Sequence, residues 1–158
     1  MTLMKAVILC IVAFTAFPAV AQDTQSDTNM EILRDKVKAD KKLVIAANMD
    51  LNEVEGKAFW PIYDAYQKDL VVLNERLGKA ILAYADAYNK KTLTNAQAMQ
   101  LSTEVLAIDQ DEITLRKTYA AQLGKVIPGI KVARYLQIEN KIRAAIRYDL
   151  AKGIPLVQ

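Results

Sequence analysis

The sequence predicts an all-α fold, an elongated antiparallel hairpin or bundle of about four long helices. Two observations support this prediction. Apolar residues recur every three or four positions through most of the chain, which is the helical period. The pattern Leu-(Asn/Thr)-x-x-(Glu/Gln) also occurs twice, at Leu51 to Glu55 and at Leu93 to Gln97, so its copies start 42 residues apart (93 minus 51). Each copy has the form of a capping box and should start a helix.

Residues 1–21 have the features of a cleavable signal peptide. A charged start that ends at Lys5 precedes an apolar run over residues 6–17, which is too short for a permanent membrane helix. Pro18 follows, and Ala19-Val20-Ala21 supplies the small residues that signal peptidase requires, so cleavage is expected before Gln22. We therefore expect an exported protein that resides in the periplasm.

The remaining composition excludes several kinds of site. The chain has one cysteine and no histidine, and Cys10 would be removed with the signal peptide. This absence excludes disulfides, thiolate or imidazole metal sites, and Ser-His or Cys-His catalysis in the mature chain. Without Lys5, 20 basic residues (21 minus 1) face 18 acidic ones, a net charge of +2 that is too balanced to indicate nucleic acid.

After the signal peptide we expect a disordered leader over residues 22–29, one helical domain over 30–152 and a tail over 153–158. A first helix should start near Asp27 or Thr28 and run to about Ala47. Asn52 should start a second helix that reaches Asn89, about 57 Å long at 1.5 Å per residue. Its apolar stripe is close to a coiled-coil heptad and consists of Phe59, Tyr63, Tyr66, Leu70, Leu73, Leu77, Ile81 and Tyr84.

Thr94 should start the third helix, and a break over residues 124–129 should end it. Its stripe consists of Leu101, Val105, Ile108, Leu115, Tyr119, Leu123 and Val126. The fourth helix should run from about Ile130 to Ala151, where Gly153 and Pro155 stop it. Whether the 42-residue repeat is a duplication or two helices that obey one heptad rule stays open.

No motif indicates catalysis, a cofactor or a metal. Asp109, Asp111 and Glu112 form an acidic cluster that could bind a hard cation, but a solvated helix surface is the favoured interpretation. Glu53 and Glu55 lie in a helix first turn, where capping and the helix dipole account for them. No Gly-rich phosphate-binding loop is present, so we expect a protein that is not an enzyme and acts without nucleotide.

Two groups of residues are candidates for binding a partner. The aromatic run around Trp60 places Tyr63 and Tyr66 on the core stripe, so packing is favoured for them, and Trp60 either packs in a groove or lines an apolar surface. The fourth helix is rich in Lys and Arg, for which a solvated face is favoured over attraction to acidic protein segments or anionic lipid. The hypothesised partner-binding residues are Trp60, Tyr63, Tyr66, Arg134, Lys141 and Arg143.

The two capping patterns also resemble the LTxxQ motif of the Spy/CpxP family of small periplasmic proteins. Leu93-Thr94-Asn95-Ala96-Gln97 matches the motif, and Leu51-Asn52-Glu53-Val54-Glu55 is a degenerate copy. The resemblance implies a curved helical cradle that dimerises through long antiparallel helices. It also implies an ATP-independent chaperone or a modulator of envelope-stress signalling. Three stretches also resemble uncharacterised exported proteobacterial helical proteins, which implies no activity: the aromatic run from Phe59 to Tyr63, the segment Tyr135 to Asn140 and the ending Ile154 to Val157.

From the sequence we therefore predict a periplasmic, chaperone-like stress protein that binds non-native polypeptides. The alternatives are a modulator that docks on a sensor-kinase domain and a structural envelope protein at an anionic lipid surface. We expect a homodimer, with coiled-coil-like helix pairing, no nucleic-acid partner and at most weak contact with anionic lipid.

Overall fold

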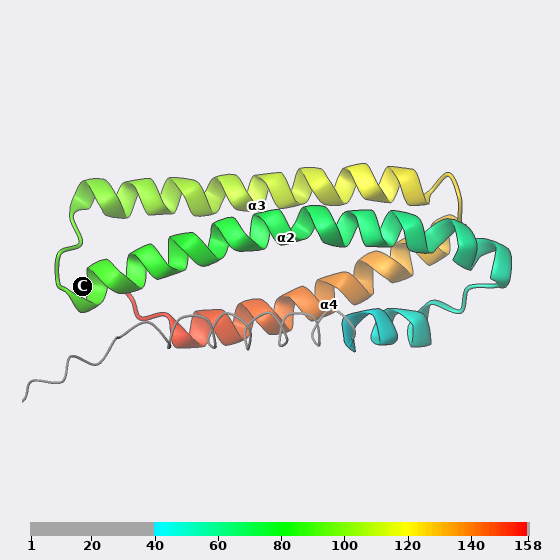
Figure 1. Ribbon diagram of the computed structural model, residues 1–158, viewed down its shortest axis with the longest axis horizontal. Helices are drawn as coiled ribbons and strands as arrows, with labels where there is room; N and C mark the ends of the chain where they lie inside the picture. The colour runs from blue at the N-terminus through cyan, green and yellow to red at the C-terminus, as the bar shows by residue number, and fades with distance from the viewer. Residues whose placement is uncertain (1–39, 158) are drawn as a thin grey trace, which may run out of the picture. The chain divides into compact units, whose positions relative to one another are not determined.

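The computed structural model describes residues 40–157, and this part of the chain is helical without strands. The chain divides into two units between Lys42 and Leu43, and each is described by itself. The described residues of the first unit, 40–42, are helical. The second unit contains a helical segment at 43–49, α2 (Glu53–Asn89), α3 (Asn95–Leu123) and α4 (Gly129–Gly153) (Figure 1). The all-α prediction is confirmed, whereas the predicted signal peptide over residues 1–21, the leader and the start of the first helix lie outside the described residues.

Both capping boxes form as the sequence predicts. The Asn52 side chain accepts a hydrogen bond from the Glu55 amide at 2.9 Å, and the Glu55 carboxylate accepts one from the Asn52 amide at 2.9 Å. Thr94 and Gln97 make the equivalent pair at 3.2 and 3.0 Å. The two boxes fix where α2 and α3 begin, because each satisfies amide groups that the first helical turn leaves unpaired.

A short turn joins α2 to α3. Lys91 adopts a positive φ of 56°. The Lys91 amide donates to the Tyr88 carbonyl at 3.1 Å and the Thr92 amide to the Ala87 carbonyl at 2.9 Å, as in a Schellman motif. The two helices then lie side by side along their lengths (Figure 1).

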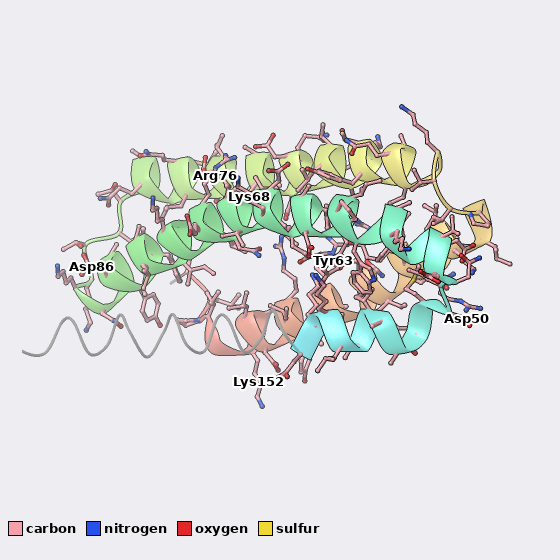
Figure 2. All side chains as sticks on the ribbon, turned by 45° about the vertical axis from the view of Figure 1, so that its right-hand side comes forward. Asp50, Tyr63, Lys68, Arg76, Asp86 and Lys152 are labelled. Carbon is pink, nitrogen blue, oxygen red and sulfur yellow. The ribbon has the colours of Figure 1, made fainter. Side chains whose placement is uncertain are left out.

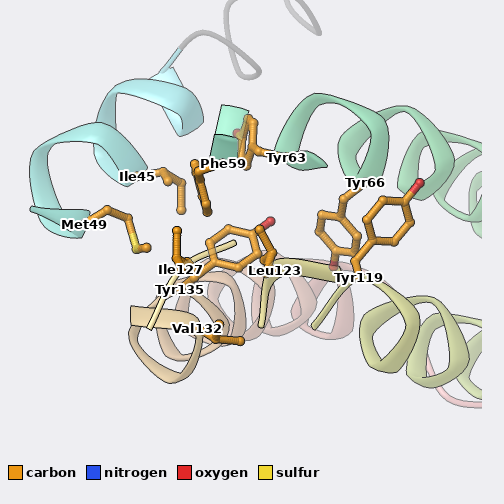
Figure 3. Close-up of a cluster of buried hydrophobic side chains, with 10 residues drawn as sticks. All are labelled: Ile45, Met49, Phe59, Tyr63, Tyr66, Tyr119, Leu123, Ile127, Val132 and Tyr135. Atoms are coloured by element: carbon orange, nitrogen blue, oxygen red, sulfur yellow. The ribbon is translucent and has the colours of Figure 1, made fainter. Parts of the chain in front are cut away.

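The densest packing gathers ten buried side chains from residues 43–49, α2, α3, the α3–α4 connection and α4 (Figure 3). Ile45, Met49 and Phe59 have no exposed surface, and Tyr135 is 2% exposed. The whole cluster consists of Ile45, Met49, Phe59, Tyr63, Tyr66, Tyr119, Leu123, Ile127, Val132 and Tyr135. Five of the ten side chains are aromatic, and large aromatic side chains bury the most apolar surface, so we expect this cluster to dominate the stability of the fold.

Away from this cluster the α2–α3 pair is thinner. Ala80, Ala87 and Ile108 are buried there, whereas the other apolar residues of the two stripes are only half-buried, among them Leu73, Leu77, Ile81, Leu101 and Val105. Two neighbouring helices cover only one side of each other, which leaves apolar side chains at the edges of the contact in partial reach of water.

α4 is attached to α2 through long side chains instead of close backbone packing. No Cα atom of α4 lies within 8 Å of a Cα atom of α2. The gap is bridged by rings, with the centroid of Tyr135 5.3 Å from that of Phe59 and 6.3 Å from that of Tyr66. Further along, Gln67 Nε2 donates to Glu139 Oε1 at 3.0 Å. Beyond α4, the Tyr84 hydroxyl donates to the Pro155 carbonyl at 2.9 Å, which ties the tail to α2.

Candidate interaction surface

The structure separates the three aromatic residues that the sequence proposed for partner binding. Tyr63 is 3% exposed and Tyr66 is 4% exposed, so both belong to the buried cluster. A partner would reach them only if the packing of this cluster opened. Trp60 is half-buried and packs edge-on against Phe59 and Tyr63, with ring centroids 5.0 and 5.3 Å apart.

Trp60 also borders an open cavity of about 410 Å³ between the end of the 43–49 segment and the first turns of α2. Gly56 leaves the indole edge uncovered, because a Cβ atom at this position would lie 3.9 Å from Trp60 Nε1. The lining residues are Ala46, Leu51, Asn52, Glu53, Gly56, Lys57 and Trp60. Glu53 and Lys57 pair with each other at 2.7 Å on its rim, so this cavity presents no free charge of either sign.

The buried tyrosines are held in their neutral form. The Tyr119 hydroxyl donates to Asp69 Oδ2 at 2.6 Å, and this hydrogen bond, with burial, raises the pKa of Tyr119 to about 12. Burial and the nearby Glu139 carboxylate raise the pKa of Tyr63 and Tyr66 well above the ordinary value. Burial likewise raises the pKa of Tyr135. Its hydroxyl makes no hydrogen bond of ordinary geometry to the described residues, although Glu139 is close enough to contribute to the shift.

Two acidic residues lie inside the fold, which corrects the expectation of solvated acidic surfaces. Glu112 is 6% exposed and Glu139 is 5% exposed. The Glu112 carboxylate forms ion pairs with Arg147 Nη2 at 3.2 Å and with Arg143 Nε at 3.4 Å, so residues of α4 supply its counter-charges. The interpretation of Glu112 as a solvated residue is therefore wrong. Glu112 faces α4, whereas the preceding residue, Asp111, has a side chain that is 51% exposed.

The basic residues of α4 divide into two sets. Three of them pair with acids of other helices. Lys131 pairs with Glu55, Arg143 pairs with Glu112, and Arg147 pairs with both Asp109 and Glu112. Arg134 and Lys141 are exposed and form no ion pair within residues 40–157. Of the three cations proposed for partner binding, Arg143 thus has a structural role and the other two remain available at the surface.

The structure also reveals a surface that the sequence reasoning missed. Met99, Leu106 and Ile113 recur every seven residues on α3 and are 67%, 69% and 41% exposed. Ala96, Thr103 and Gln110 lie beside them and are exposed as well. These six residues, which we call the outer α3 face, fall within about 100° of helix arc. The period of seven was visible in the sequence, but the stronger stripe that packs on α2 obscured it.

Acidic and basic side chains on both flanks of the outer α3 face pair with each other, whereas Lys117, one turn beyond Ile113 in the same arc, is exposed and forms no ion pair within the described residues. On one side Arg76 binds Glu104 at 3.0 Å and Asp111 at 2.6 Å. On the other side Arg147 binds Asp109 at 2.7 Å. The Thr103 hydroxyl donates to the Met99 carbonyl at 2.9 Å, so this polar group is satisfied within the helix. The six residues thus form an uncharged and mostly apolar strip along the middle of a long helix, and Lys117 lies beyond its C-terminal end.

Comparison of the chain with family models, with curated proteins and with solved structures finds no match. The resemblance to the Spy/CpxP family therefore stays a prediction that depends on the two five-residue motifs. The described residues contain no group of acidic, histidine or cysteine side chains that could hold a metal ion. No described helix is both long and apolar enough to cross a membrane.

Proposed function

We propose that this protein binds non-native polypeptides, without nucleotide, through the outer α3 face. The observation that supports this function is the exposure of Met99, Leu106 and Ile113 along one uncharged strip. Exposed apolar patches on soluble proteins mark interaction sites, because contact with a partner removes that apolar surface from water.

The chemistry of the strip suits a partner whose sequence varies. It has no charged member, so an apolar client segment would not have to desolvate a charge to bind there. Met99 has a flexible and polarisable side chain that adapts to different neighbours. The helix itself is held in place by α2, so binding would not require the strip to be ordered first.

The remaining parts of this proposal come from the sequence. We propose export to the periplasm, as the signal-peptide pattern of residues 1–21 predicts, and a role in envelope stress, as the resemblance to Spy/CpxP proteins implies. We also propose that α2 and α3 form an elongated antiparallel hairpin and that two copies associate. In this arrangement the hairpin would present the outer α3 face along its length.

Suppression of client aggregation tests this function. A chemically denatured model client is diluted into buffer with the purified protein and no nucleotide, and light scattering is followed. We expect suppression near one-to-one stoichiometry, which Leu106→Asp should abolish. Leu82→Asp on α2 is the matched control, since Leu82 is 70% exposed and Leu106 is 69% exposed. The control should retain suppression.

Two results would contradict the proposal. In the first, both variants or neither lose suppression, and the outer α3 face then has no special part in binding. In the second, Leu106→Asp converts a dimer to a monomer in analytical ultracentrifugation but leaves suppression intact. The face would then be the subunit interface, and clients would bind elsewhere.

A further inference from the structure

A second surface, on α4, combines unpaired cations with exposed apolar side chains. Arg134, Lys141 and Lys152 are exposed and form no ion pair within the described residues. Ile130 and Tyr148 are 76% and 69% exposed. With Ala145 these residues make up what we call the outer α4 face, and at 100° per residue they fall within about 60° of helix arc. Figure 2 shows Lys152 pointing away from the other helices.

The basic residues of α4 that have an acidic partner and those that have none lie on different faces of the helix. The helix has six basic residues, and Lys131, Arg143 and Arg147 are neutralised by acids of α2 and α3. The three without an acidic partner all lie on the outer α4 face. Of the two acids in α4, Glu139 is buried on the other side and Asp149 lies at the edge of the face. The six residues of the face are thus basic or apolar, and Asp149 is the acid that borders them.

We infer that the outer α4 face docks on an anionic lipid surface. The six residues extend over about 33 Å of a helix, from position 130 to position 152, in a nearly straight row. A straight row of cations fits a plane of phosphate groups, whereas a folded acidic protein would have to present a matching row of carboxylates. Tyr148 and Ile130 lie in the same row, and such side chains settle at the boundary between headgroups and acyl chains.

This inference is independent of the proposed function, because it concerns a different helix and a different kind of partner. Binding is measured by co-sedimentation of the purified protein with vesicles of phosphatidylglycerol or phosphatidylcholine. Because each cation near an anionic membrane contributes about a fivefold gain in binding, the triple variant Arg134→Gln, Lys141→Gln, Lys152→Gln should weaken binding to phosphatidylglycerol about 100-fold. Salt at about 1 M, where the Debye length is about 3 Å, should abolish it.

The matched control carries Lys68→Gln, Lys79→Gln and Lys117→Gln, which removes the same charge from α2 and α3. These lysines are exposed and form no ion pair within residues 40–157. The control should weaken vesicle binding less than about fivefold, because its charges lie away from the contact. Circular dichroism verifies that both triple variants remain helical.

Three results would overturn the inference. Equal loss in the two triple variants would show that only the net charge matters. Equal binding of the wild-type protein to phosphatidylglycerol and phosphatidylcholine vesicles would show that the cations do not contribute to vesicle binding. Binding to polyglutamate at the same salt without binding to phosphatidylglycerol vesicles would assign the face to an acidic polypeptide.

Discussion

At the scale of single residues, Lys91 holds a backbone conformation that suits glycine. Its φ of 56° lies in the left-handed region, where a side chain is strained. Lys91→Gly should therefore raise the free energy of unfolding by roughly 0.5–1 kcal/mol. Lys90 has a φ of −80°, so Lys90→Gly is the matched control and should destabilise the protein. Urea unfolding checks both, and stabilisation by neither or by both variants would contradict the turn geometry.

Tyr119 makes a second residue-scale prediction, about alkaline pH. Its pKa in the folded protein is about 12, raised by the hydrogen bond to Asp69 and by burial, against 10.0 for a free side chain. A group with a raised pKa stabilises the fold fully below its unfolded pKa, and this contribution is lost as the pH rises through the folded pKa. The difference in unfolding free energy between the wild type and Tyr119→Phe should be about 1 kcal/mol at neutral pH.

That difference should shrink between pH 10 and about 12, where the wild-type contribution is lost and Tyr119→Phe has no hydroxyl to ionise. Urea unfolding of both proteins across this pH range measures it. A difference that stays constant throughout would mean that the Tyr119–Asp69 hydrogen bond does not contribute to stability.

At the scale of secondary-structure elements, the two capping boxes allow a matched comparison. Replacing either cap, Asn52→Ala or Thr94→Ala, should cost about 1 kcal/mol. The residues at the N3 position of the two helices differ in their contacts. Glu55 also binds Lys131 of α4, whereas the hydrogen bonds of the Gln97 side chain stay within its own capping box. Glu55→Ala should therefore lower the melting temperature more than Gln97→Ala does.

The excess loss in Glu55→Ala should also depend on pH. The hydrogen bond from Lys131, followed by that from the Asn52 amide, lowers the pKa of Glu55 below its ordinary value of 4.5. The contribution of Glu55 is then complete above pH 4.5 and is lost as the pH falls further. Equal melting temperatures for Glu55→Ala and Gln97→Ala at neutral pH would contradict a role for Lys131.

The attachment of α4 gives the second element-scale prediction. Glu112→Gln would leave Arg143 and Arg147 without their buried counter-charge and should cost about 2–3 kcal/mol. Asp111→Asn on the same helix breaks a pair whose side chains are 51% and 35% exposed, and it should cost less than about 1 kcal/mol. Urea unfolding separates these outcomes, and equal losses would show that Glu112 does not hold α4 in place.

The sequence predicts the helices better than it predicts how they meet. α2 and α3 each begin at a capping box whose two side chains are only three positions apart in the sequence. The local pattern at Asn52 and at Thr94 is therefore enough to predict where each helix starts. The burial of Glu112 depends on Arg143 and Arg147, some thirty positions further along the chain, and no local pattern reports that contact. The assignment of Tyr63 and Tyr66 to the core follows from spacing, whereas the availability of Arg134 and Lys141 needed the structure.

At the scale of the whole molecule, packing and the proposed binding surfaces divide between different helix faces. The inner faces of α2, α3 and α4 gather the aromatic cluster and the buried carboxylates. The outer α3 face is apolar and uncharged, and the outer α4 face is apolar and basic. The client proposed for the outer α3 face and the lipid surface proposed for the outer α4 face would therefore bind at separate places.

The most direct test of polypeptide binding places a photo-crosslinking amino acid at position 106 of α3 or at position 82 of α2. Each purified protein is mixed with a chemically denatured client, irradiated and analysed by electrophoresis and mass spectrometry. We predict that position 106 cross-links to the client and that position 82, equally exposed, does not. Client cross-links of equal yield at both positions, or cross-links from position 106 only to a second copy of the chain, would contradict binding at the outer α3 face.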